Sequence, residues 1–180
     1  MNQHYEVAKV MNLKNLKPND LLVMPRFGVG QCRGWHTMEI DGFKLQVLSI
    51  YFYTQKFIMH LPKAKLDAFS ARALASLGEV AEAFAILKNQ KISKQHNWRN
   101  FVIDCHRQMN SGEFKKLAQV IKDTAPNATK IIGPNKCKTD LHNTAIALLA
   151  NELMFIQNTT HSQALEKIQK AVNLSSSTQK

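Results

Sequence analysis

Hydrophobic and polar residues follow two different periods along the chain, and the change falls near residue 72. Before this point, short apolar runs are separated by turn signals, a pattern typical of antiparallel β-strands. The pair Asp41-Gly42 is a strong signal for a hairpin turn. We expect four or five strands, lying mainly in residues 19–24, 29–40, 43–52 and 56–62. So few strands can bury one face only in a strongly bent sheet or a small open barrel.

After residue 72, apolar residues recur every three or four positions, which is the spacing of amphipathic helices. Two prolines and a glycine within residues 125–137 exclude one continuous helix there. The pattern therefore predicts five helices, over residues 78–89, 97–110, 111–124, 138–156 and 161–172.

The predicted fold class is α+β: a small, bent, antiparallel N-terminal β-sheet followed by an all-α C-terminal domain of about five helices. We place the two domains at residues 14–72 and 73–173. The remaining residues, 1–13 and 174–180, are expected to be flexible, as chain ends often are.

The segment Gly28-Val29-Gly30 raises the question of a phosphate-binding loop. Such loops read GxxxxGK[ST] or GxGxxG and lead from a strand into a helix, whose N-terminus then faces the phosphate. Here the glycines are spaced GxGxxxG, and the residues that follow are strand-like. We expect instead a turn at Pro25 and Gly28. At Gly30 and Gly34 we expect a β-bulge or the close approach of another backbone.

The composition excludes several classes of protein. Apolar residues make up 44% of the chain, which is typical of globular proteins and too high for a disordered one. No run approaches the ~18 consecutive apolar residues that a membrane helix needs. Residues 1–15 also lack the apolar core of a signal peptide. We therefore expect a cytoplasmic protein without a membrane partner.

Residues that could carry catalysis or hold a metal are widely separated. The three cysteines, Cys32, Cys105 and Cys137, form no CxxC pair, which argues against a disulfide framework or a zinc site. Asp104 and His106 are two positions apart and diverge on a helix, so they do not form a catalytic pair. We expect buried or half-buried thiols, no metal, no cofactor and no enzymatic activity.

The chain is strongly basic, with a formal net charge of +11. Residues 88–138 alone hold eleven Lys and Arg against three acidic residues. Such a charge favours a polyanionic partner, either nucleic acid or an acidic protein surface. Alternatively, these basic residues form only a well-solvated surface and bind no polyanionic partner.

Five motifs follow one another along residues 16–172. They are LKPNDLLVMPRFGVGQCRG, MEIDG, MHLPKAKLDAFSARAL, NWRNFVIDCHRQMNSGEFKKLAQVIKDT and NEL. None is specific alone, but their order and spacing resemble the CarD/CdnL family of bacterial RNA polymerase-binding transcription regulators.

The resemblance implies a Tudor-like N-terminal domain that binds the β subunit of RNA polymerase. It implies a helical C-terminal domain that contacts promoter DNA in the minor groove with weak sequence specificity, and so stabilises the open promoter complex. We expect a monomer that reaches the nucleoid through polymerase. Its implied polymerase contacts are Trp35, Met38, Lys44 and His60, and its implied DNA contacts are Lys94, His96, Trp98, Arg99, Lys136 and Lys138.

The chain departs from the family pattern at several of these places. Met38 and His60 stand where family members use basic residues against polymerase, and a methionine cannot make the bidentate contact of an arginine. Asn100 and Phe101 replace an arginine pair that often follows the tryptophan. We therefore expect polymerase binding to depend more on backbone pairing and apolar contacts.

Trp98 has two interpretations. The resemblance implies a wedge at the upstream edge of the melted DNA, where an apolar side chain can hold an unstacked step. The helical spacing of Trp98 with Phe101, Cys105 and Met109 instead fits packing in the helix core.

Two other functions stay open. The protein could be a polymerase-binding adaptor that has lost its DNA contact. It could also be a general RNA- or ribosome-associated basic protein, although few aromatic residues accompany the lysines as stacking platforms.

Overall fold

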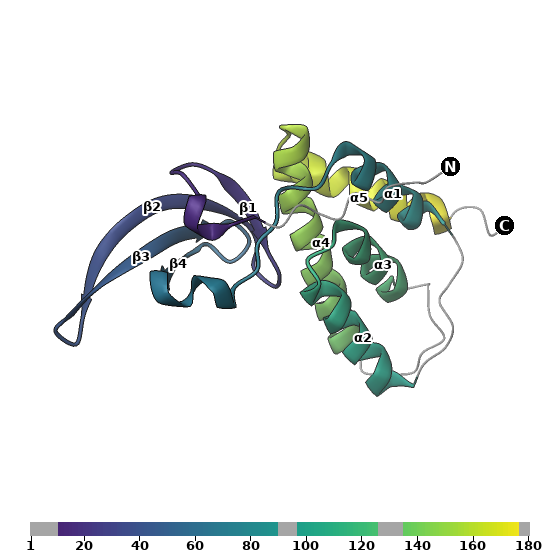
Figure 1. Ribbon diagram of the computed structural model, residues 1–180. Coiled ribbons are helices and arrows are strands. Elements are labelled where there is room, and N and C mark those ends of the chain that lie inside the picture. Colours follow the sequence, from purple (N-terminus) through teal and green to yellow (C-terminus); the bar gives the residue numbers. More distant parts are fainter. Residues whose placement is uncertain (1–10, 90–96, 126–134, 177–180) are drawn as a thin grey trace, which may run out of the picture. The chain divides into compact units, whose positions relative to one another are not determined.

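The computed structural model describes residues 11–89, 97–125 and 135–176. The chain divides into two compact units, Met1–Leu74 and Ala75–Lys180. The first, which we call the sheet unit, contains η1 (Leu13–Asn15), β1 (Leu21–Met24), β2 (Gly28–Ile40), β3 (Phe43–Phe52), β4 (Phe57–Pro62) and η2 (Lys63–Ala68) (Figure 1).

The sheet unit is one antiparallel sheet with strand order β1-β2-β3-β4. Each strand pairs with the next one along the chain, because every connection is a tight turn. Asp41 and Gly42 have φ angles of 51° and 81° and form the β2–β3 turn predicted from the sequence. The inner face of the sheet packs against η1 and η2 through a core that includes Leu13, Leu22, Leu48, Ile50, Phe52, Leu61 and Leu66.

The glycines in residues 28–34 shape the sheet and do not cradle a phosphate. Gly28 has a φ of 77° and ends the β1–β2 turn, as predicted. At Gly34, with a φ of 99°, the β2–β3 register shifts, which marks the predicted bulge. Gly30 lies against side chains and not against another backbone: a Cβ there would lie 2.6 Å from Cγ2 of Ile50 and 2.9 Å from Cε1 of Phe52.

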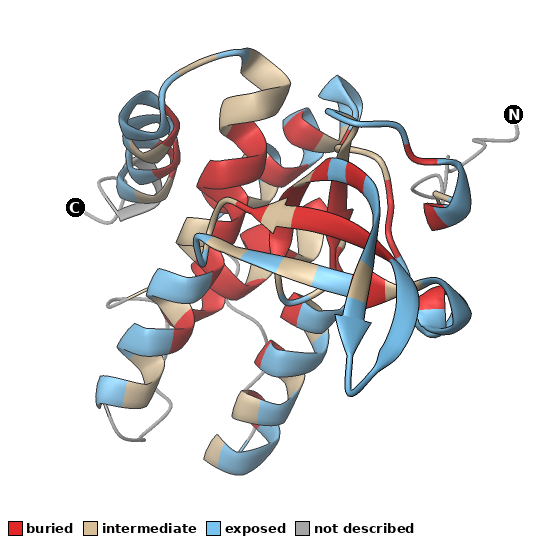
Figure 2. Cartoon of the chain, turned by 90° about the vertical axis from the view of Figure 1, so that its left-hand side faces the viewer, coloured by how far each residue is buried: buried red, intermediate tan, exposed pale blue. Residues whose placement is uncertain are grey.

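The second unit, which we call the helical unit, is all α. Its helices are α1 (Leu77–Lys88), α2 (Trp98–Asn110), α3 (Phe114–Thr124), α4 (Asn135–Gln157) and α5 (His161–Ser176). α3 packs against α1, α2 and α4, while α5 packs against α1 and α4. The shared core includes Phe101, Phe114, Leu117, Ile121, Leu149, Leu153 and Ile168, and Figure 2 shows buried residues along one side of these helices.

The predicted fold class is confirmed, and the helix boundaries differ in places. The sequence pattern predicts helix over residues 111–113, but Gly112 has a φ of 71° and the segment forms a turn before α3. α4 begins at Asn135, three residues earlier than predicted, and α5 continues to Ser176. Of the expected flexible ends, residues 1–10 and 177–180 lie outside the described part of the chain. None of the described helices is long and apolar enough to cross a membrane.

Polar contacts hold the beginning of the helical unit in place. Glu152 on α4 is 1% exposed, and its carboxylate accepts a hydrogen bond of 2.9 Å from the backbone N–H of Ala75. α1 then starts with a capping box between Ser76 and Glu79. These bonds tie the first residues of the unit to its central helix.

His142 makes the stability of the helical unit depend on pH. Its Nδ1 lies 2.9 Å from Oγ1 of Thr124, and burial, with a smaller effect of Lys138, lowers the pKa of its imidazole. In the unfolded chain a histidine binds its proton near pH ~6.5. Below that pH the unfolded state therefore binds more protons than the folded state, and the free energy of unfolding falls.

We expect acidification from neutral to mildly acidic pH to destabilise the helical unit and His142→Gln to reduce this pH dependence. Denaturant titrations followed by Trp98 fluorescence in a Trp35→Phe background measure both effects. An equal pH dependence in the two proteins would contradict the assignment to His142.

Candidate functional site

The four predicted polymerase-contact residues lie on two faces of the sheet. Strand side chains alternate between faces, and the β2–β3–β4 register places Met38 and His60 on the face opposite the core. We call this the outer face. Trp35 pairs with the core residue Leu48, so Trp35 and Lys44 lie on the other side. The structure thus brings Met38 and His60 to one surface and separates them from Trp35 and Lys44.

A polar cluster occupies the middle of the outer face. Oγ of Ser49 lies 2.6 Å from Nδ1 of His60 and 3.3 Å from Nδ1 of His36. The two imidazole rings meet edge to face, with centroids 5.3 Å apart. Nearby, the guanidinium of Arg33 lies 5.4 Å from the centre of the Tyr51 ring. The outer face therefore carries two imidazoles and a guanidinium held by aromatic and hydroxyl contacts.

An apolar stripe continues the outer face toward the hairpin turn. There Met38 pairs with Leu45, and Ile40 pairs with Phe43. Phe43 is 72% exposed, Ile40 44% and Leu45 37%, and Figure 2 shows this end of the hairpin as exposed. Sequence reasoning placed only Met38 at a site. Strand alternation from Met38 would have shown that Ile40 shares its face.

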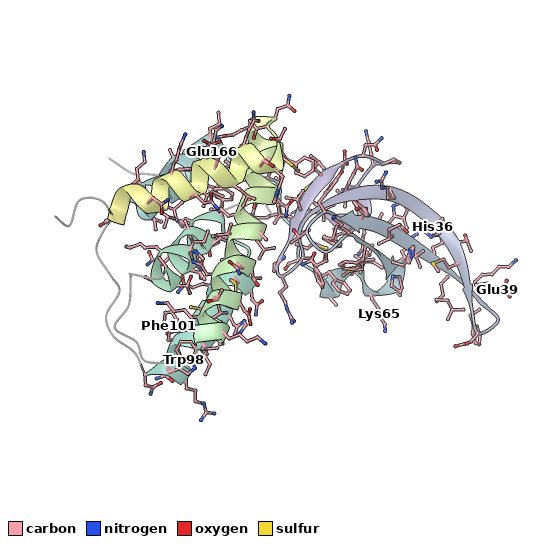
Figure 3. The ribbon with its side chains drawn as sticks, turned by 180° about the vertical axis from the view of Figure 1, so that it is seen from behind. His36, Glu39, Lys65, Trp98, Phe101 and Glu166 are labelled. Atoms are coloured by element: carbon pink, nitrogen blue, oxygen red, sulfur yellow. The ribbon has the colours of Figure 1, made fainter. Side chains whose placement is uncertain are left out.

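Trp98 is the first residue of α2 and lies at one end of the helical unit (Figure 3). The side chain of Asn97 caps the helix by accepting a hydrogen bond of 2.9 Å from the N–H of Asn100. The indole is half-buried: it packs at the margin of the core, 5.8 Å from the Phe101 ring. One part of the Trp98 side chain therefore contacts the core and another part is exposed to solvent. Arg99, the next residue, is exposed.

The first turn of α4 packs through Cys137 against the same core as α2. Burial, the carboxylates of Asp123 and Asp104, and Cys137 in the first turn of α4 raise the pKa of the Cys105 thiol to about 12. The two helices begin at the same end of the unit (Figures 1 and 3). This end gathers Trp98 and Arg99 from α2 and the predicted DNA-contact residues Lys136 and Lys138 from α4.

The basic residues at this end differ in their surroundings. Lys136 is exposed, whereas Lys138 is half-buried, and this burial lowers its pKa. Lys94 and His96, also predicted to contact DNA, lie outside the described residues. The exposed side of α2 adds Ile103, His106 and Arg107, which sequence reasoning did not select. Arg107 forms an ion pair of 2.7 Å with Asp104.

The three cysteines are free, with Cys32 and Cys105 buried and Cys137 half-buried, as predicted. Within the described ranges, no group of three or more His, Cys, Asp or Glu side chains could hold a metal ion.

Comparison with known proteins identifies the helical unit. Residues 82–169 match the family model described as CarD, C-terminal domain. The chain belongs to the CarD family. The matched segment of this CarD-family protein runs from α1 into α5 and contains Trp98, Arg99, Lys136 and Lys138. No curated protein matches the chain.

The family resemblance predicted from the sequence is thereby confirmed, and the protein is CarD-like and transcription-related. The match does not include the sheet unit, so the Tudor-like character of residues 14–72 and the individual contact residues stay predictions.

Proposed function

We propose that this CarD-family protein is a transcription regulator that binds the β subunit of RNA polymerase through its sheet unit. Its helical unit then contacts DNA at the upstream edge of the melted promoter and stabilises the open complex. The match of residues 82–169 to the CarD C-terminal domain carries the proposal. CarD-family proteins are associated with RNA polymerase, and their role is regulation and not catalysis.

The basic end of the helical unit supports a DNA contact. α2 starts with Trp98 and Arg99, α4 holds Lys136 and Lys138 in its first turn, and the two helices begin at the same end of the unit (Figures 1 and 3). Helix N-termini carry a partial positive charge, which adds to the attraction of these side chains for phosphates. In this arrangement the cations hold the DNA backbone, and the exposed part of the indole contacts the unstacked step.

The outer face of the sheet supports a protein contact. It joins Met38 and His60 in one surface with exposed apolar side chains. Trp35 and Lys44 lie on the opposite face of the sheet, so polymerase would have to contact both faces to bind all four residues. We therefore expect Met38 and His60 to contribute more to polymerase binding than Trp35 and Lys44.

One observation favours a second function, a polymerase-binding adaptor without DNA contact. Trp98 packs against Phe101 and the helical core, so part of its indole has a structural role. The two functions differ in whether the helical unit adds salt-dependent DNA affinity.

The proposed function is tested with the full chain, RNA polymerase from the source bacterium and a promoter DNA fork. We expect the chain to co-purify with polymerase and to bind the fork with an affinity that falls steeply as salt rises. Lys136→Gln should reduce the slope of log K against log salt by about one, because one phosphate contact is lost.

Thr144→Ser, a conservative change at an exposed residue of α4, is the control for this slope. Failure to bind polymerase would reject the function. Polymerase binding together with salt-independent or absent DNA affinity would establish the adaptor instead.

A further inference from the structure

The β2–β3 hairpin extends past both of its neighbours. β1 pairs with β2 only as far as Gln31, and β4 pairs with β3 only as far as Val47. Residues 37–40 and 43–46 therefore form a two-stranded ribbon, and within the described chain no further strand pairs with either of its edges. An isolated two-stranded ribbon is marginally stable in water. A partner that covers one face of the ribbon would thus stabilise it.

The two faces of the ribbon differ in chemistry. One face carries the cross-strand pairs Thr37–Gln46 and Glu39–Lys44, which suit water. The outer face carries only Met38, Ile40, Phe43 and Leu45, which we call the apolar ribbon face. Figure 3 shows Glu39 near the tip of the hairpin and His36 nearer the body of the sheet.

Stability of the hairpin alone does not account for this apolar face. Cross-strand apolar pairs contribute only about 0.2–1 kcal/mol each. Phe43 remains 72% exposed and Ile40 44% exposed. Clustered exposed apolar side chains on a soluble protein typically mark a binding surface.

The hydrogen-bond donors on the rest of the outer face indicate which partner fits. Arg33, His36 and His60 lie on it, next to the apolar ribbon face. Asp and Glu are absent from the outer-face positions of the described strands. The complementary surface therefore has an apolar groove at one end and carboxylates at the other.

A second copy of this chain is a poor fit to that surface. Two copies that met only through their apolar ribbon faces would each bury an area on the order of a few hundred Å², whereas a stable interface buries about 800 Å² on each partner. Two copies placed outer face to outer face would also leave the Arg33 guanidinium of each copy without a carboxylate partner, because the described strands offer none on this face.

We propose that the apolar ribbon face determines the specificity of polymerase docking by seating in an apolar groove of the β subunit that is bordered by carboxylates. The identity of this partner rests on the proposed function. Ile40 and Phe43 enter the groove, while Arg33 and the two imidazoles face its acidic border.

The test compares Ile40→Thr/Phe43→Thr with Thr37→Gln/Gln46→Thr. The first pair removes the two most exposed apolar side chains and keeps residues that favour strands. The second exchanges two residues across the polar face of the same ribbon and keeps its composition. Affinity of the full chain for purified RNA polymerase is measured at low and high salt, and affinity for the DNA fork reports on the helical unit.

We expect the Ile40/Phe43 variant to bind polymerase about tenfold or more weakly, as loss of central apolar anchors does, at both salt concentrations. Its DNA affinity and the polymerase affinity of the Thr37/Gln46 variant should equal those of the wild type. Equal polymerase binding by the Ile40/Phe43 variant would overturn the inference and leave the proposed function standing.

Two other outcomes would also overturn the inference. A wild-type chain that does not bind polymerase at all would reject the proposed function along with it. A wild-type dimer that the Ile40/Phe43 variant dissociates would make the ribbon a self-association surface.

Discussion

Gly30→Val is expected to destabilise the sheet unit strongly and to leave the stability of the helical unit unchanged. A Cβ at residue 30 would lie 2.6 Å from Cγ2 of Ile50 and 2.9 Å from Cε1 of Phe52, and both of these side chains are fully buried. Neither can move aside, because each packs into the only core of its unit in the described residues. Overpacking of this kind costs about 3 kcal/mol, a large fraction of the stability of a small domain.

The two tryptophans allow each unit to be followed separately, since Trp35 lies in β2 and Trp98 in α2. In single-tryptophan backgrounds, Gly30→Val should shift the denaturation midpoint seen by Trp35 and leave the midpoint seen by Trp98 unchanged. Thr37→Val is the matched control in the same strand, because residue 37 is exposed and valine, like threonine, favours strands. An unshifted Trp35 midpoint in Gly30→Val would show that the sheet core can rearrange.

Local chemistry explains which parts of the fold could be predicted. Asp41-Gly42 places two residues with positive φ next to each other, so the β2–β3 hairpin follows from neighbouring residues alone. The role of Gly30 depends on Ile50 and Phe52, which reach it only through the β2–β3 register. The sequence indicated a close approach there, but of another backbone and not of these side chains.

For the candidate site, strand alternation could be predicted from the sequence, whereas the position of the bulge and the limits of strand pairing could not. Trp35 and Met38 are three positions apart in one strand, so their placement on opposite faces follows from the sequence. Which of them faces outward depends on the bulge between Cys32 and Gly34, because one extra residue reverses the alternation beyond it. The ribbon likewise depends on where β1 and β4 stop pairing, and tertiary register is not encoded in local pattern.

Trp98→Ala is expected to shorten the lifetime of the open promoter complex about tenfold or more, because the wedge at an unstacked step offsets a cost of a few kcal/mol. Affinity for polymerase should not change, since Trp98 belongs to the helical unit and the proposed docking surface to the sheet unit. Competitor-challenge assays of preformed complexes measure the lifetime, and circular dichroism checks that the variant is folded.

The difficulty with this variant is that Trp98 also packs against Phe101, so Trp98→Ala destabilises the helical unit as well. Val102→Ala separates the two effects, because Val102 is half-buried on the same helix and packs against the same core. If packing alone were responsible, the two variants would shorten the lifetime in proportion to their loss of stability. A lifetime that falls with Trp98→Ala by more than this proportion comes from the exposed part of the indole. A lifetime that Trp98→Ala leaves at the wild-type value would favour the adaptor without DNA contact.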